Sequence, residues 1–267
     1  EFLDFGKIAI PLIIICIISV LVIIKFLIKI LKIPTRMAYL ISIGSTVCGT
    51  TAIIATAPVI KASKNEVSYA IANITLFGIL SMLIYPYFAN FYFDSDPLFV
   101  GLFLGTSIHE TSQVAASGLI YDQQFNSPET LNVATVTKLI RNTFLVILIP
   151  LFAFLYNRGE LKGQNYSILS IFPYFVIGFI GMIIVRNIGD HVFTPENNSY
   201  FLWTSLIGYL KTLATVFLTM AMAAVGISIN LSELKSMGYK PFVVGLIAAI
   251  TVGFISLIYI ETLIKFI

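Results

Sequence analysis

The sequence predicts an all-α, polytopic membrane protein, and three observations support this prediction. Hydrophobic residues make up 58% of the 267 residues and charged residues only 11%, against about 45–50% and about 25% in soluble domains. The chain contains long apolar runs, most of them long enough for a membrane span of about 20 residues. Short polar connectors such as Lys61–Glu66 and Asp94–Asp96 separate the runs, so no soluble domain fits between them.

Eight apolar runs follow one another along the chain, and their length and composition predict membrane helices. They are Ile8–Leu31, Met37–Ile60, Val67–Phe91, Pro97–Tyr121, Leu131–Tyr156, Ser167–Val185, Phe201–Ile229 and Phe242–Ile264. Because no linker or composition change divides them, residues 1–267 are predicted to form a single transmembrane transporter domain.

Two of these runs are too polar for ordinary spanning helices. Met37–Ile60 is dense in serine, threonine and glycine, and Pro97–Tyr121 also contains His109 and Glu110. Such residues are costly against lipid and are tolerated where a helix breaks around a cavity, or where small residues pack closely on other helices. Ionisable residues inside a membrane are functional by default. We therefore predict two broken segments, with close helix packing as the alternative.

The two polar runs are copies of each other. Gly44–Ala55 aligns without gaps with Gly105–Ala116, and the register holds downstream to within a residue or two. The internal repeat covers approximately residues 37–91 and 98–156, and each copy is a broken segment followed by a long helix.

Loop charge predicts how the two copies lie in the membrane, because short cytoplasmic loops are rich in Lys and Arg. Basic residues flank the first polar run on both sides: Lys25, Lys29, Lys32 and Arg36 before it, and Lys61 and Lys64 after it. The second polar run is flanked by Asp94, Asp96, Asp122 and Glu129 without nearby basic residues. This pattern predicts two re-entrant hairpins that enter from opposite faces, hence an inverted repeat typical of secondary transporters. If both runs instead crossed fully, the repeats would be parallel.

A fainter symmetry relates the two ends of the chain. Leu3–Gly6 with Pro11 resembles Leu234–Gly238 with Pro241, which opens the last run. Because a long apolar run precedes the second pattern, a matching helix is expected before Glu1. The chain is therefore predicted to be N-terminally truncated.

Two cations stand within the apolar run Leu131–Tyr156. Lys138 and Arg141 lie three residues apart, hence on one helix face, and replace Leu76 and Ile79 of the first repeat. Cations in an apolar helix are expensive unless they are paired or solvated. The planar fork of Arg141 suits a tetrahedral oxyanion, with Lys138 as a point charge. The pair predicts an anion site, although Lys138 could instead snorkel to the external headgroups.

The remaining candidates surround this pair. The predicted substrate-binding residues are Lys138, Arg141, Thr50, Thr51, Thr111, Ser112, Gln113 and Asn73. Asn73 and Thr75 lie on the helix of the first repeat, and a buried Asn73 could also merely bridge helices. His109 and Glu110 are predicted to carry ion coupling, because imidazole titrates near neutral pH and a buried carboxylate can do so. A fixed salt bridge from Glu110 to either cation is the alternative.

Other function classes fit the sequence poorly. His109 and Glu110, followed by Gln113, resemble a zinc-protease motif, but the second histidine ligand is absent. Two cysteines and two histidines predict no metal site, and no catalytic residue or cofactor is predicted. The net charge of +3 is spread thinly, so nucleic acid is not an expected partner.

Several stretches resemble the YeiH-like family of bacterial inner-membrane proteins, grouped as sulfate exporters. They are Cys48–Ile53, Ala57–Ile60, Ala70–Gly78, Gly105–Ala116, Ala134–Arg141, Ala221–Gly226 and Gly238–Pro241. The resemblance covers nearly the whole chain, with Glu110 where many relatives carry Asp, and relatives extend further at the N-terminus. It implies an ion-coupled carrier with elevator-type relatives. Sulfate is only a provisional substrate of the family, so the resemblance carries more weight for fold than for substrate.

Together these observations predict a secondary transporter of a small anion, such as sulfate or a related sulfur oxyanion or sulfonate. The family resemblance implies that it is an exporter. The expected partners are the anion, H⁺ or Na⁺ as coupling ion, and the lipid bilayer, and a homodimer is compatible with the sequence. An anion channel is one alternative. A membrane enzyme or sensor scaffold that uses His109 and Glu110 is another.

Overall fold

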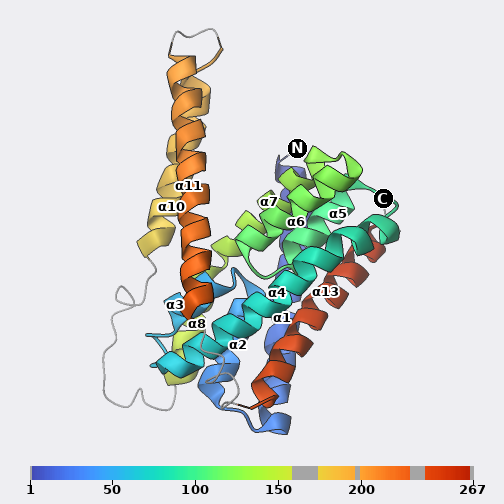
Figure 1. The fold of residues 1–267 in the computed structure, drawn as a ribbon, viewed down its shortest axis with the longest axis vertical. Coiled ribbons are helices and arrows are strands. Elements are labelled where there is room, and N and C mark those ends of the chain that lie inside the picture. The colour runs from blue at the N-terminus through green and yellow to red at the C-terminus, as the bar shows by residue number, and fades with distance from the viewer. Residues whose placement is uncertain (1, 158–173, 196–198, 229–237, 265–267) are drawn as a thin grey trace. The chain divides into compact units, whose positions relative to one another are not determined.

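The computed structural model describes residues 2–157, 174–195, 199–228 and 238–264, and the regular structure in these ranges is entirely α-helical (Figure 1). The chain divides into two compact units, one formed by Glu1–Ile171 with Asn230–Ile267 and the other by Phe172–Ile229. Among the described residues, four helices are long and apolar enough to cross a membrane. They are Gly6–Leu31, Lys64–Tyr92, Pro128–Phe152 and Lys240–Leu263.

The first unit contains α1 (Phe2–Leu31), α2 (Thr35–Thr46), α3 (Thr50–Thr56), α4 (Lys64–Tyr92), α5 (Pro97–Ser107), α6 (Thr111–Phe125), α7 (Pro128–Thr143), α8 (Leu145–Asn157) and α13 (Lys240–Ile264). Local sequence explains several of the helix starts. Ser63 and Glu66 form a capping box at α4, and the Asp96 carboxylate caps α5 just before Pro97. Both devices satisfy N–H groups that lack an intrahelical partner.

Each of the two polar runs is divided into two helices by a three-residue interruption. Helix α2 ends at Thr46 and α3 begins at Thr50, while α5 ends at Ser107 and α6 begins at Thr111. The ungapped alignment pairs Thr46 with Ser107 and Thr50 with Thr111, so the interruptions occupy equivalent positions. With 12 and 11 residues, α2 and α5 each rise about 16–18 Å, roughly half of a membrane core about 30 Å thick.

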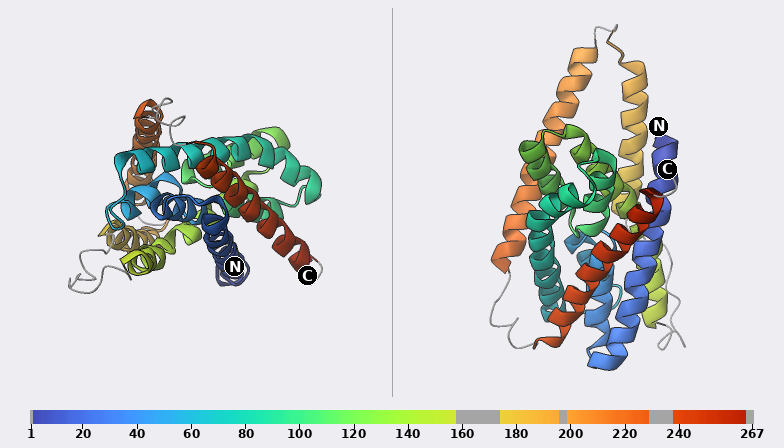
Figure 2. Two further views of the ribbon diagram at one scale, coloured as in Figure 1. Left: turned by 90° about the horizontal axis from the view of Figure 1, so that it is seen from below. Right: turned by 90° about the vertical axis from the view of Figure 1, so that its right-hand side faces the viewer.

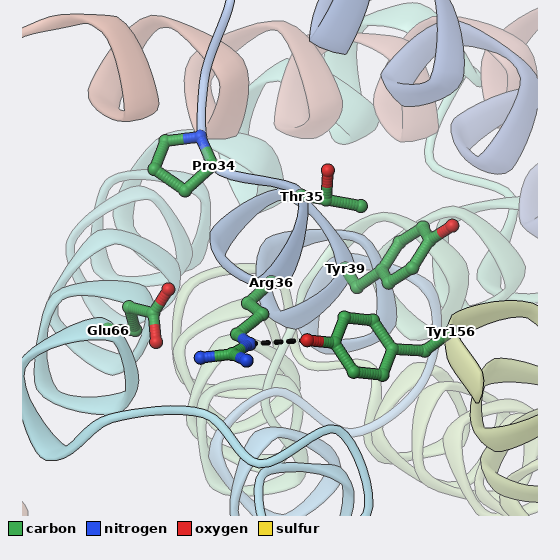
Figure 3. Close-up of a pocket in the computed structure, with 6 residues that line it drawn as sticks. All are labelled: Pro34, Thr35, Arg36, Tyr39, Glu66 and Tyr156. Atoms are coloured by element: carbon green, nitrogen blue, oxygen red, sulfur yellow. Dashed lines mark hydrogen bonds between the residues drawn. The ribbon is translucent and has the colours of Figure 1, made fainter. Parts of the chain in front are cut away.

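The start of α2 and the start of α4, which flank the first polar run, lie at one pocket of about 440 Å³ (Figure 3). Its lining residues are Pro34, Thr35, Arg36, Tyr39, Glu66 and Tyr156. The Arg36 Nε donates a hydrogen bond of 2.5 Å to the Tyr156 hydroxyl, which brings the end of α8 to the same place. The chain thus returns, at the start of α4, to the end of the unit from which α2 departs.

The second polar run also returns to its starting end. The Tyr121 hydroxyl near the end of α6 donates a hydrogen bond of 2.8 Å to Asn90 Oδ1 near the end of α4. The Phe125 ring lies 6.2 Å from that of Tyr87. Because the end of α4 leads directly into α5, the second run begins and ends in one neighbourhood.

Helices α1, α4 and α13 pack against the polar runs. Helices α4 and α13 run parallel, because Asn73 Nδ2 donates to the Pro241 carbonyl (2.9 Å) at their beginnings and Tyr92 donates to Glu261 (3.1 Å) near their ends. Helix α1 runs antiparallel to α13, as both figures show (Figures 1 and 2). A 2.5 Å hydrogen bond between Thr106 and Ser256 joins α5 to α13.

Helix α7 packs closely on α5, which requires a small residue on the facing helix. A Cβ added at Gly105 would lie 2.6 Å from the Ala134 carbonyl oxygen, so only glycine fits there. The predicted single helix Leu131–Tyr156 is α7 followed by α8. Phe144, between them, keeps helical dihedral angles and donates to the carbonyl of Arg141, so the helix tightens locally rather than turning away.

The second unit contains α10 (Tyr174–Val192) and α11 (Tyr200–Ser228). Near the connection between them, Asp190 pairs with Arg186 (2.6 Å) and accepts a hydrogen bond from the Trp203 indole (2.8 Å). The beginning of the predicted run Ser167–Val185 lies outside the described residues. So do residues 229–237, which contain most of the sequence pattern that was matched to the N-terminus.

The positions of the helix ends predict how the first unit can be labelled in a membrane. Single cysteines at Thr35 and Lys64, in a background without Cys16 and Cys48, should react with an impermeant thiol reagent added to the same side. Single cysteines at Asp94 and Gln124 should also share a side, opposite to the first pair. Reaction of Thr35 and Lys64 variants from opposite sides would contradict the arrangement.

Candidate functional site

The interruptions of the two polar runs meet inside the first unit. We call Val47–Gly49 the first tip and Ile108–Glu110 the second tip. The Glu110 side chain reaches from the second tip to Thr50, the residue that follows the first tip. Gly49 has φ of +67°, and a Cβ added there would collide with the Glu110 side chain. The first tip therefore requires glycine both for its backbone conformation and for the approach of Glu110.

The Glu110 carboxylate is held by hydroxyl and amide donors. Its Oε1 accepts hydrogen bonds from the Thr50 N–H (3.3 Å), the Thr50 hydroxyl and the Thr75 hydroxyl (3.4 Å). Glu110 is only 3% exposed, and its Oε2 has no hydrogen-bond partner among the described residues. No hydrogen bond or ion pair within the described ranges joins Glu110 to Lys138 or Arg141, so the fixed salt bridge considered as an alternative is not formed.

Lys138 is fully buried, with 0% of its surface exposed. Its ammonium donates to the backbone carbonyls of Val47 (2.6 Å), Ile108 (2.9 Å) and His109. One carbonyl belongs to the first tip and two belong to the second. The alternative in which Lys138 snorkels to the headgroups is therefore wrong, because the ammonium is directed into the protein where the tips meet.

Arg141 is buried on the same face of α7, one turn further along. Its Nε donates to the Thr46 carbonyl (2.7 Å), and its Nη2 donates to the carbonyl of Ser45. Its Nη1 donates to the carbonyls of Thr106 (2.6 Å) and Ile108 (3.2 Å). These carbonyls are the unpaired C-terminal groups of α2 and α5, where the helix dipole favours a cation.

The two cations thus donate their hydrogen bonds to the protein's own backbone. An ammonium has three N–H donors and a guanidinium has five, and the bonds above engage all three of Lys138 and four of Arg141. The fork predicted to bind a tetrahedral anion is directed at carbonyl oxygens in this structure. Their positive charges remain within the site, but few of their donors are left for a substrate.

His109 is the other ionisable side chain at the second tip. It is 0% exposed, and neither ring nitrogen has a hydrogen-bond partner among the described residues. Its counterpart in the first tip, Cys48, is also buried. The second tip therefore has a fully buried imidazole next to the buried Glu110 carboxyl group, whereas the first tip has Cys48 and Gly49 at these positions.

The other predicted residues differ in how close they come to the tips. Gln113 is buried and its Nε2 donates to the Thr75 carbonyl (3.2 Å), and the Thr111 hydroxyl accepts from Asn142 (3.2 Å). Asn73 donates a hydrogen bond to the backbone of α13, so it bridges two helices, which is the alternative considered for this residue. Thr51 is exposed and Ser112 is half-buried.

Sequence reasoning missed Asn142 and the carbonyls of the helix ends. Asn142 is half-buried and lies beside Arg141 in α7, and an amide side chain within an apolar run was the signal that could have identified it. Backbone carbonyls have no signature in the sequence, because every residue carries one.

Comparison with known proteins identifies relatives along most of the chain. The family described as conserved hypothetical protein 698 matches residues 1–245. A UPF0324 membrane protein of Fusobacterium nucleatum subsp. nucleatum is 34% identical over 258 residues, 94% of this chain and 74% of the relative. One of Streptococcus agalactiae serotype V is 36% identical over 246 residues, 90% of this chain and 69% of the relative.

A third relative is the UPF0324 inner membrane protein YeiH of Salmonella typhi. It is 32% identical over 223 residues, which cover 82% of this chain and 58% of that relative. No solved structure matches the chain significantly. The resemblance to YeiH-like proteins is confirmed, and the names of these relatives state a membrane protein without a substrate.

Gly49→Ala should lower the free energy of unfolding by about 1–3 kcal/mol, because alanine is strained at positive φ and its Cβ meets Glu110. Gly208→Ala in α11 is the control, since no atom lies within 4 Å of the added Cβ. Detergent-solubilised variants can be compared by thermal unfolding. Equal stability of the two variants would mean that the first tip tolerates a side chain.

Arg141→Gln should lower the free energy of unfolding by about 3–5 kcal/mol, because carbonyls at two buried helix ends lose a charged donor. Arg186→Gln removes an exposed ion pair and should change it by at most about 1 kcal/mol. Denaturant titration of both variants measures the difference. An Arg141→Gln variant as stable as Arg186→Gln would refute the structural role assigned to Arg141.

Proposed function

The chain belongs to the family described as conserved hypothetical protein 698, and we propose that it is an ion-coupled secondary transporter of a small anion in the bacterial inner membrane. The observation that carries the proposal is the contact between the two tips, in which Glu110 of one repeat accepts hydrogen bonds from Thr50 of the other. It joins a titratable group to a set of anion-binding donors. Sulfate, related sulfur oxyanions and sulfonates are the proposed substrate class, and export is the proposed direction.

The composition of the site supports transport rather than a purely structural role. Glu110 and His109 are buried in an all-helical membrane protein, where ionisable groups are expensive and mark substrate or ion pathways. They lie where two helices are interrupted, and interrupted helices form the binding sites of many secondary transporters near the middle of the membrane. The half-span lengths of α2 and α5 agree with that depth.

The donors around Glu110 suggest how an anion would be bound. Thr50 and Thr75 donate to a carboxylate oxygen, so the same groups can donate to an oxygen of a substrate anion. Lys138 and Arg141 add positive charge nearby without direct contact, in place of the direct ligand role predicted from the sequence. When Glu110 is protonated its hold on these donors weakens, and a substrate anion can replace it. Proton uptake and anion binding are thereby linked.

The bonds of α7 support an elevator-type movement. Lys138 and Arg141 tie both tips to one helix, so the tips and α7 would move together as one body while the site passes between the two faces. The return of each polar run to its starting end supports re-entrant hairpins and an inverted repeat. A homodimer would provide a fixed scaffold for such movement.

Two alternatives predict different measurements. An anion channel lined by the same tips would give flux that does not saturate and does not respond to a proton gradient. An enzyme or sensor that uses His109 and Glu110 would give turnover or signalling without flux. Saturable uptake into proteoliposomes that responds to a pH gradient would favour the transporter.

The substrate class can be tested on the purified protein by thermal stabilisation. Sulfate, sulfite, thiosulfate, taurine, other sulfonates and carboxylates form the panel. A ligand present at 100 times its dissociation constant adds about 2.7 kcal/mol of stability, which is a readily measured shift. The anion that stabilises most is then the substrate for flux measurements.

Glu110→Gln should remove the pH dependence of anion binding. In the wild type, ionised Glu110 competes with the anion, so affinity should fall as pH rises, by at most about tenfold per pH unit for one linked proton. The uncharged variant should bind the anion with the same affinity at every pH value tested. Titration of the selected anion at several pH values measures both.

Glu129→Gln, an exposed carboxylate in the first turn of α7, is the matched control and should keep the wild-type pH dependence. If Glu110→Gln and Glu129→Gln behave alike, the anion and Glu110 do not compete, and proton coupling does not run through this carboxylate.

A further inference from the structure

The environment of the Lys138 ammonium is unusual for a lysine side chain. It is fully buried, and its hydrogen bonds go to the backbone carbonyls of Val47, Ile108 and His109 rather than to a carboxylate. No ion pair to Lys138 occurs in the part of the chain that the structure describes. The hydrogen-bond partners of this charge are carbonyl dipoles.

Carbonyl groups arranged in this way form a cation site. The three oxygens come from both tips, just beyond the C-terminal ends of α2 and α5, where the helix dipoles place partial negative charge. In transporters with interrupted helices, such carbonyls and helix ends coordinate the coupling cation. An ammonium group and a free monovalent cation interact with these oxygens in the same way, because each is a compact positive charge in close contact with them.

We propose that the Lys138 ammonium is the resident cation of a carbonyl-lined monovalent cation site between the tips. The site would accept a free ammonium or alkylammonium ion if the side chain were removed. The consequence for transport rests on the proposed function. The transport cycle needs no sodium ion between the tips, because the covalently attached ammonium group of Lys138 occupies that position.

The repeat explains why one lysine is enough. The counterpart of Lys138 in the first repeat is Leu76, which is 44% exposed, so the first repeat directs no cation at the tips. Lys138 bonds to carbonyls of both tips, and a single charge therefore serves both. Arg141 is different, because its flat group spreads over carbonyls further back along α2 and α5 and shares only Ile108 with Lys138.

The test is chemical rescue of a lysine-deleted variant. Lys138→Ala removes the equivalent of a propylammonium ion and should lower Tm by roughly 10 °C or more. Propylammonium or methylammonium chloride should restore part of that loss in a saturable manner. Choline chloride at the same concentration controls for ionic strength, because choline has no N–H donor and is too bulky.

Arg141→Ala is the matched control for the shape of the site. It removes a guanidinium group, so it should respond to guanidinium derivatives such as ethylguanidinium and not to propylammonium. Equal responses of both variants to propylammonium, or no response of Lys138→Ala beyond that to choline, would overturn the proposal.

Wild-type protein provides a second measurement that does not depend on the variant folding. Replacing sodium by choline should leave its Tm and its proton-driven anion flux unchanged. A loss of either on sodium removal would overturn the inference that Lys138 fills the cation's place. Absence of anion flux under all ion conditions, together with rescue of Lys138→Ala, would reject the proposed transport function and leave the cation site standing.

Discussion

The two cations of α7 hold the carbonyl ends of both interrupted helices, and the rest of the first unit is arranged around this interaction. A helix that ends inside a protein leaves its last carbonyls without intrahelical partners, and burying such groups unpaired is costly. Lys138 and Arg141 supply donors to both helix ends at once. The tips can therefore remain non-helical and polar. Close packing of α7 on α5 through Gly105 brings the two cations within hydrogen-bonding distance of these carbonyls.

The repeat is symmetric in its backbone and asymmetric in its chemistry. Both copies interrupt their helices at equivalent positions, yet the first tip has Cys48 and Gly49 where the second has His109 and Glu110. Gly49 leaves the space that the Glu110 side chain occupies. The second repeat contributes the charged side chains, the first contributes the Thr50 donors, and both contribute backbone carbonyls. The candidate site is thereby built from two similar halves.

This arrangement changes the roles expected for the polar residues. Arg141 and Lys138 bind the ends of the interrupted helices, whereas Glu110 and the threonines around it are the residues to which we assign exchange of an anion and a proton in the proposed function. Family membership agrees with a membrane protein and leaves the substrate open.

By itself the amino-acid sequence predicted the helical class, the membrane environment, the similarity of the two polar runs and an interruption in each of them. These features depend on local properties, namely hydrophobic length, small and polar residues, and self-similarity. It also identified Lys138, Arg141, His109 and Glu110 as exceptional, because charge in an apolar run is costly wherever the run lies. Only the tertiary structure decided their partners. The oxygens that receive Lys138 and Arg141 are backbone carbonyls, which every residue possesses, and the Thr50 donors reach Glu110 only after residues 60 positions apart have been brought together by folding.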